Sequence, residues 1–180
     1  MFIDFSSAFN TMRPTTLIRK LQSMGVCCGL CWWILDYLHG RTQQVRVNDC
    51  QSGSVTTTIG APQGCVLSPV LFTIYTDDHR SDTSDVIISK FADDTAIIGL
   101  ISDRNETAYR NSIDSFVRRC STDDLELNVT KTKEMVVDFR THGGNISSVT
   151  ILGSEVDRVA QYKYLGTVMT SNLYWSANTE

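Results

Sequence analysis

The sequence lacks the features that mark several large classes of protein. No apolar run approaches the ~18 uncharged residues that a membrane helix needs, and no basic leader precedes an apolar stretch. We therefore expect neither a membrane span nor a secretion signal. Internal repeats, low-complexity segments and linkers are also missing from the sequence, which predicts one domain over residues 1–180.

Histidine and paired cysteine are too scarce to build an obvious zinc site. The chain has 3 histidines and 6 cysteines, and only Cys27, Cys28 and Cys31 stand close together. A structural zinc usually needs a second pair of ligands at similar spacing, so we expect these thiols to pack in a helix. Unpaired thiols also predict a reducing, intracellular setting, nuclear or cytoplasmic.

Basic residues are in short supply as well. The chain has 16 Lys and Arg against 20 Asp and Glu, a net charge of −4, whereas a phosphate-binding surface calls for the opposite balance. Between Asp77 and Glu126 the count is twelve acidic against six basic residues. Clustered carboxylates suit a site for divalent cations, but charge alone also permits a plain acidic domain.

What the chain does contain is an orderly series of helix and strand patterns. In chain order we expect a strand over 1–5, helices over 14–24 and 30–38, strands over 43–47 and 54–59, a helix from 68 to about 77, a hairpin over 86–100, a helix from about 103, and strands over 134–139, 149–152 and 162–169 with a turn at Gly143–Gly144. This order predicts an α+β domain, an antiparallel sheet with helices packed on one face.

Local signals predict where two of these helices begin. Ser68 and Pro69 form a good N-cap and first-turn pair, and Glu106 lies three residues after Asp103 in a variant of the capping box. The apolar stripe of the helix after Asp103 is predicted to be buried, and its members are Tyr109, Ile113, Phe116, Val117 and Cys120.

Three acids interrupt apolar strands and point to chemistry. Asp93 and Asp94 sit at the expected turn of the 86–100 hairpin, and Asp4 lies within Phe2–Phe5. A buried carboxylate is unfavourable unless it is paired or bound to a metal, and three on neighbouring strands could hold Mg²⁺. Taken alone, the Asp93–Asp94 pair favours a solvated turn, where Asp is common.

Five ordered stretches carry a family resemblance across almost the whole chain. They are Phe2-x-Asp4-x-x-x-Ala8-Phe9, Ala61-Pro62-Gln63-Gly64-Cys65-Val66-Leu67-Ser68-Pro69, Phe91-Ala92-Asp93-Asp94, Leu125-x-Leu127-Asn128-x-x-Lys131-Thr132-Lys133, and Tyr164-Leu165-Gly166. These stretches resemble motifs A to E of reverse transcriptases, and their residues are most similar to those of the non-LTR (LINE-type) retrotransposon branch. The fold that the resemblance implies is a polymerase palm with a ferredoxin- or RRM-like core.

The resemblance also implies a role for each matching position. Asp4, Asp93 and Asp94 would hold two Mg²⁺ ions for RNA-directed DNA synthesis, and Lys131 would protonate the leaving pyrophosphate. Further positions would contact substrate: Phe5 and Phe9 the incoming nucleotide, Pro62, Gln63 and Gly64 the templating base pair, and Tyr164, Leu165 and Gly166 the primer side. Read without the resemblance, Phe9 packs in the core, Pro62–Gly64 is a plain turn and Lys131 is a surface lysine.

The resemblance implies an RNA template, a DNA primer and deoxynucleoside triphosphates as partners. It also implies that the fingers are cut off before residue 1 and that most of the thumb is missing after about residue 170, so we expect weak or absent activity from these residues alone. Asn10, Cys65 and Asp77 depart from the family pattern, which bears on nucleotide positioning.

Three other interpretations remain open from the sequence. A decayed retroelement remnant that binds nucleic acid or protein would keep the same acids without catalysis. An RNA-copying RNA polymerase shares the metal acids, although Phe9 and the stretch from Lys131 to Lys133 argue against it. An unrelated metal-binding α+β domain would leave the order of the five motifs to chance.

Overall fold

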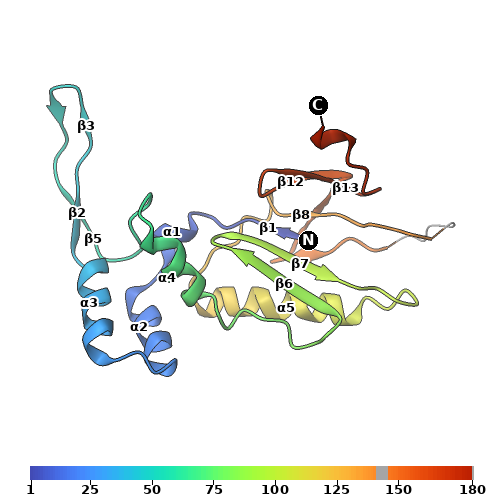
Figure 1. The fold of residues 1–180 in the computed structure, drawn as a ribbon, viewed down its shortest axis with the longest axis horizontal. Helices are drawn as coiled ribbons and strands as arrows, with labels where there is room; N and C mark the ends of the chain where they lie inside the picture. The colour runs from blue at the N-terminus through green and yellow to red at the C-terminus, as the bar shows by residue number, and fades with distance from the viewer. Residues whose placement is uncertain (141–145, 180) are drawn as a thin grey trace.

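The computed structural model describes residues 1–140 and 146–179, and a five-stranded sheet forms its centre (Figure 1). The strand order is β11-β8-β1-β7-β6. The strands are β1 (Phe2–Ile3), β6 (Val86–Phe91), β7 (Asp94–Gly99), β8 (Lys133–Glu134) and β11 (Asp157–Arg158). The α+β prediction is confirmed, but the sheet is not purely antiparallel, because β11 pairs with β8 in parallel.

Helix α5 (Thr107–Thr122) covers one face of this sheet (Figure 1). Four members of its predicted stripe are buried, and Val117 is partly buried against the same core. The contact with β7 is close, since a Cβ added to Gly99 would stand 2.6 Å from the Tyr109 ring. The expected helix-covered face is therefore present.

The remaining helices, α1 (Ala8–Thr11), α2 (Pro14–Ser23), α3 (Cys28–Leu38) and α4 (Leu67–Tyr75), group beside one end of the sheet (Figure 1). Helix α2 has Pro14 in its first turn, and Gly25 follows its end with a φ of +82°, as the sequence predicts. Cys31 is buried in α3, whereas Cys27 and Cys28 are exposed. Among the helices in the described ranges, none is both long and apolar enough to cross a membrane.

Two predicted helix starts are wrong. Helix α4 begins at Leu67 with Val66 as its N-cap, because the Ser68 hydroxyl donates to the Pro62 carbonyl at 2.5 Å and makes no cap. Helix α5 begins at Thr107 instead of near Asp103, since left-handed φ angles of 53° at Asp103 and 61° at Arg104 break the helical path.

The hairpin of β6 and β7 turns one residue earlier than predicted. Phe91 pairs with Asp94, so the two-residue turn is Ala92–Asp93, and Ala92 takes a left-handed φ of 54°. Asp94 is consequently the first residue of β7. Its side chain therefore follows the regular alternation of β7 between the two faces of the sheet, and this alternation fixes the face on which the Asp94 carboxylate lies.

The strands after α5 are shorter than predicted. Of the expected 134–139 strand only β8 forms, and the 149–152 strand becomes the pair β9 (Thr150–Ile151) and β10 (Ser154–Glu155). The single strand expected over 162–169 is instead a hairpin of β12 (Gln161–Tyr164) and β13 (Thr167–Thr170), followed by the short helix η1 (Ser176–Asn178). The predicted Gly143–Gly144 turn lies outside the described residues.

The predicted strands between α3 and α4 form a two-stranded ribbon that extends away from the helices (Figure 1). Its base pairs β2 (Arg41–Gln43) with β5 (Val55–Thr57), and its outer part pairs β3 (Arg46–Val47) with β4 (Cys50–Gln51). The tip lies at Asn48, which has a φ of 52°.

Candidate active site

Asp4 and Asp94 are brought together by the register of two central strands. Strand β1 runs antiparallel to β7, with Phe2 opposite Ala96 and Ile3 opposite Thr95. One further step of this register sets Asp4 across from Asp94. Residues directly opposite each other in antiparallel strands project to the same face, so both carboxylates lie on the face away from α5.

The backbone around Asp4 is held on both sides. Strand β7 lies on one side of it. On the other side, the Asp4 carbonyl accepts a hydrogen bond from Asn128 N at 2.9 Å, and the Asp4 amide donates to the Thr132 hydroxyl at 3.2 Å. Leu127 also bridges to Phe5. Motif D is thus laid along motif A, and Lys131 occupies the turn between Asn128 and Thr132.

The Asp4 side chain carries the chemical signal of the site. Within the described part of the chain, its Oδ2 is buried and has no hydrogen-bond partner. A buried carboxylate oxygen without a donor is unfavourable and is normally explained by a ligand or an ion. The donor set, carboxylate oxygen beside carboxylate oxygen, is the kind that Mg²⁺ prefers.

The charges of the three acids act on one another. Burial, then the negative charges of Asp93 and Asp4, raise the pKa of Asp94 above its ordinary value. The three carboxylates are neighbours but have not converged: among the described residues, the only three-residue group with ligand atoms within 4.8 Å of one another lies elsewhere. A shared ion would require these side chains to rotate toward each other.

A pocket of about 630 Å³ opens beside Asp93 and joins motifs A, B and C. Its lining includes four of the five residues predicted to hold the nucleotide and the templating pair, namely Phe5, Phe9, Gln63 and Gly64, together with the predicted metal ligand Asp93. Phe9 also packs against Phe72 with ring centroids 5.3 Å apart, so the structure gives it both the pocket and the core position. Pro62 is half-buried beside the lining and accepts the Ser68 hydrogen bond.

Cys65, one of the positions that depart from the motif pattern, lines the same pocket and has polar neighbours. Its Sγ lies 3.0 Å from the Ser68 hydroxyl and 3.2 Å from the Tyr37 hydroxyl of α3. Hydrogen bonds from Ser68 and Tyr37 stabilise the thiolate and lower the pKa of Cys65 to about 7. Sequence reasoning missed this cluster because Tyr37 is distant in the chain.

The hairpin of β12 and β13 stands over the sheet face that carries the acids. The Tyr162 ring stacks on Phe2 with centroids 4.3 Å apart, and the Tyr164 hydroxyl donates to the Asp94 carbonyl at 3.5 Å. Burial, followed by the charges of Asp4 and Asp94, raises the pKa of Tyr162. The predicted primer-side residues Leu165 and Gly166 form the turn of this hairpin, with φ angles of 49° and 83°.

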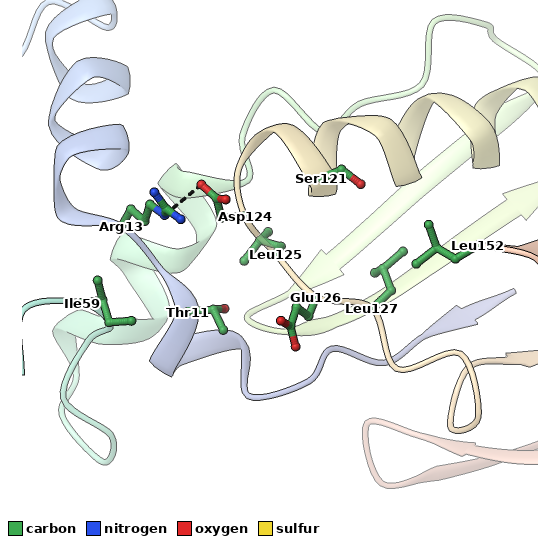
Figure 2. A pocket seen from close by; sticks show the side chains of 9 residues that line it. All are labelled: Thr11, Arg13, Ile59, Ser121, Asp124, Leu125, Glu126, Leu127 and Leu152. Atoms are coloured by element: carbon green, nitrogen blue, oxygen red, sulfur yellow. Dashed lines mark ion pairs between the residues drawn. The ribbon is translucent and has the colours of Figure 1, made fainter.

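A second hollow, of about 510 Å³, lies between the α1–α2 junction and the chain that follows α5 (Figure 2). Arg13 forms an ion pair with Asp124 at 2.8 Å along its edge. Leu127 of motif D also lines it, but none of the residues with a predicted catalytic or binding role does.

The one group with metal-ligand spacing in the described ranges consists of Asp78, His79 and Asp123. The Lys20 ammonium already lies between its carboxylates, 2.6 Å from Asp78 Oδ1 and 2.5 Å from Asp123 Oδ2. Lys20 therefore supplies the positive charge that a metal would bring, and we interpret this group as a structural ion network. Nothing in the sequence signalled it, since its members come from separate segments.

Comparison with known proteins decides the family. A model of the reverse transcriptase (RNA-dependent DNA polymerase) family matches residues 1–169. The chain belongs to the reverse transcriptase family. Members of this family are nucleotidyltransferases, and the interpretation as an unrelated metal-binding domain is excluded.

The reverse transcriptase chain is similar to polymerases of insect mobile elements. It is 27% identical to the probable RNA-directed DNA polymerase from transposon BS of Drosophila melanogaster, over 96% of this chain and 20% of that protein. It is 28% identical to the RNA-directed DNA polymerase from mobile element jockey of Drosophila funebris, over 96% of this chain and 19% of that protein. The predicted resemblance to the non-LTR branch is thereby confirmed, and the chain spans about a fifth of these relatives' length.

Proposed function

We propose that this reverse transcriptase chain is the palm of an RNA-directed DNA polymerase that adds deoxynucleotides to a DNA primer on an RNA template. The observation that carries the proposal is the β1–β7 register, which sets Asp4 opposite Asp94 while Asp93 borders a pocket lined by motif A and motif B. A ferredoxin-like core and a position between fingers and thumb belong to the same proposal.

Two Mg²⁺ ions would be held by Asp4, Asp93 and Asp94, and the unpartnered Oδ2 of Asp4 fits that role. When bound, such ions activate the primer hydroxyl and neutralise the leaving pyrophosphate. The pocket residues bind and orient: Phe9 lies under the sugar and disfavours a ribose 2′-hydroxyl, and Gln63 contacts the templating base pair. Both positions border the same cavity as Asp93.

Three further residues act on the leaving group and the primer. Lys131, in the turn beside Asp4, donates a proton to pyrophosphate. Tyr164 anchors the β12–β13 turn to the Asp94 carbonyl, and Gly166 lets that turn approach the primer strand closely.

The test is Mg²⁺-dependent primer extension on an RNA template, carried out with the longest polypeptide that contains these residues. Asp93→Asn should lower the extension rate by about 1,000-fold, because metal binding contributes several kcal/mol to transition-state stabilisation. Asp85→Asn is the matched control, an exposed acid just before β6, and should extend normally. Equal rates for Asp93→Asn and Asp85→Asn would refute the metal role.

A further inference from the structure

Motif A and the start of the motif B loop are joined through their backbones. Gly60 N donates to the Met12 carbonyl and Ala61 N donates to the Phe9 carbonyl, both at 2.7 Å. These bonds tie the loop to the end of α1. Phe9 and Gly64, which both line the pocket, are therefore carried by segments that are bonded to each other.

Gly60 shows how close this contact is. A Cβ at this position would stand 2.8 Å from the Phe9 carbonyl oxygen and 2.9 Å from Asn10 Cα, and both of these are backbone atoms that cannot rotate away. The φ of +77° independently favours glycine. The two backbones are fixed at this point, whereas the Gln63 side chain is exposed and can change its orientation.

One side-chain hydrogen bond spans the two segments. Gln63 Nε2 donates to Asn10 Oδ1 at 3.2 Å. We propose that Asn10 is a positioning residue that sets the orientation of the Gln63 amide, and thereby the affinity of the pocket for the incoming nucleotide. This inference rests on the proposed function and deepens it. It gives a role to Asn10, one of the positions where the sequence departs from the family pattern.

The chemistry of residue 10 decides which end of the Gln63 amide faces the pocket. The Asn10 oxygen accepts from Gln63 Nε2, which leaves Gln63 Oε1 directed elsewhere. An aspartate at position 10 can only accept, so it would hold the same orientation. A leucine has nearly the same shape but offers no acceptor, and the Gln63 amide would then rotate freely.

The test measures KM for deoxynucleotides and kcat in the longest polypeptide that contains the chain. Asn10→Leu should raise KM by about threefold to tenfold, the range expected for one neutral hydrogen bond, with less change in kcat because the carboxylates are untouched. Asn10→Asp, which keeps the acceptor, should have a KM close to that of the wild type. In a Gln63→Leu background, Asn10→Leu should add no further rise in KM, since its partner has been removed.

Several results would overturn the inference while leaving the proposed function intact. One is an unchanged KM in Asn10→Leu. A second is a rise in KM caused by Asn10→Leu that is just as large in the Gln63→Leu background. A third is a KM for Asn10→Asp that is as high as that of Asn10→Leu. A wild type without Mg²⁺-dependent extension would instead count against the proposed function. In that case the same double-mutant cycle is measured by urea unfolding of the 180-residue chain. A coupling free energy of zero between positions 10 and 63 refutes the contact between their side chains, and a measurable coupling supports it.

Discussion

Replacing Lys20 by methionine should destabilise the fold severely, because Lys20 is the cation of a buried network. Its Nζ donates to the Tyr75 carbonyl at 2.5 Å and contacts Asp78 at 2.6 Å and Asp123 at 2.5 Å. The Lys20 and Asp123 side chains are only 11% and 5% exposed, and His79, which contacts Asp123 at 2.8 Å, is fully buried. Methionine keeps the length of the side chain and removes the charge.

The expected loss is about 3 kcal/mol in the free energy of unfolding, the lower end of what breaking a buried ion pair costs when one charge stays behind. For a chain of this length that corresponds to a fall in Tm of about 6–12 °C. Urea unfolding of the 180-residue chain measures it. Lys133→Met is the matched control, because its 2.7 Å partner Asp157 is 73% exposed, and it should cost less than about 1 kcal/mol.

The network also has an expected pH dependence. Burial raises the pKa of Asp123, but hydrogen bonds from His79 and Lys20 outweigh it and hold the pKa below the ordinary 3.8. A carboxyl group with a lowered folded pKa stabilises the fold above its unfolded pKa, and that contribution is lost as the pH falls through the folded value. Adding Asp123→Asn to Lys20→Met should restore part of the stability, since no buried carboxylate is then left without its ammonium partner; Asp78 also loses Lys20, but its side chain is exposed. Equal losses for Lys20→Met and Lys133→Met would refute the reasoning.

Two further predictions concern the candidate active site. The rate of Cys65 alkylation by iodoacetamide, followed by peptide mass spectrometry, should rise with pH through a midpoint at about pH 7. Tyr37→Phe should move that midpoint to higher pH, because it removes a hydrogen-bond donor to the thiolate. A midpoint unaffected by Tyr37→Phe would contradict this. In EDTA at pH 7, Asp94→Asn should raise the free energy of unfolding by no more than about 0.5 kcal/mol, and Tm slightly with it. The reason is that a raised pKa in the folded state means that ionised Asp94 is destabilising. That gain should vanish below pH 3.8, where the carboxyl is protonated in both states, and a lower Tm for Asp94→Asn at pH 7 would refute the mutual repulsion.

Local periodicity predicted the elements whose burial is decided within one segment. The Pro14–Ser23 helix and the stripe from Tyr109 to Cys120 follow from 3.6-residue spacing, because the same residues that favour the helix also form its buried face. The start of α4 was mispredicted because the Ser68 hydroxyl bonds to the Pro62 carbonyl, six residues earlier, instead of capping the helix. Local preference for a cap cannot anticipate such a competing partner.

Pairing between distant segments was the part that sequence could not supply. The parallel β8–β11 pair joins two-residue strands that carry too few residues for any periodic signal. The contacts between Lys20 and Asp123, and between Asn10 and Gln63, likewise depend on where whole segments dock. The motif order singled out Asp4, Asp93 and Asp94 as candidate acids, but the turn at Ala92–Asp93, one residue earlier than expected, determined that Asp94 faces Asp4.

The geometry of the acids is thus a property of sheet register more than of side-chain packing. Asp4 is fixed by β7 on one side and by the Asn128 hydrogen bond on the other, both of which are backbone interactions. A slip of one residue in β1 would turn the Asp4 carboxylate onto the face that packs against α5. Backbone hydrogen bonds do not depend on which side chains surround them. The register can therefore tolerate many side-chain substitutions, which accords with a chain that matches the reverse transcriptase family model over residues 1–169 while sharing only 26–28% of its residues with the Drosophila polymerases.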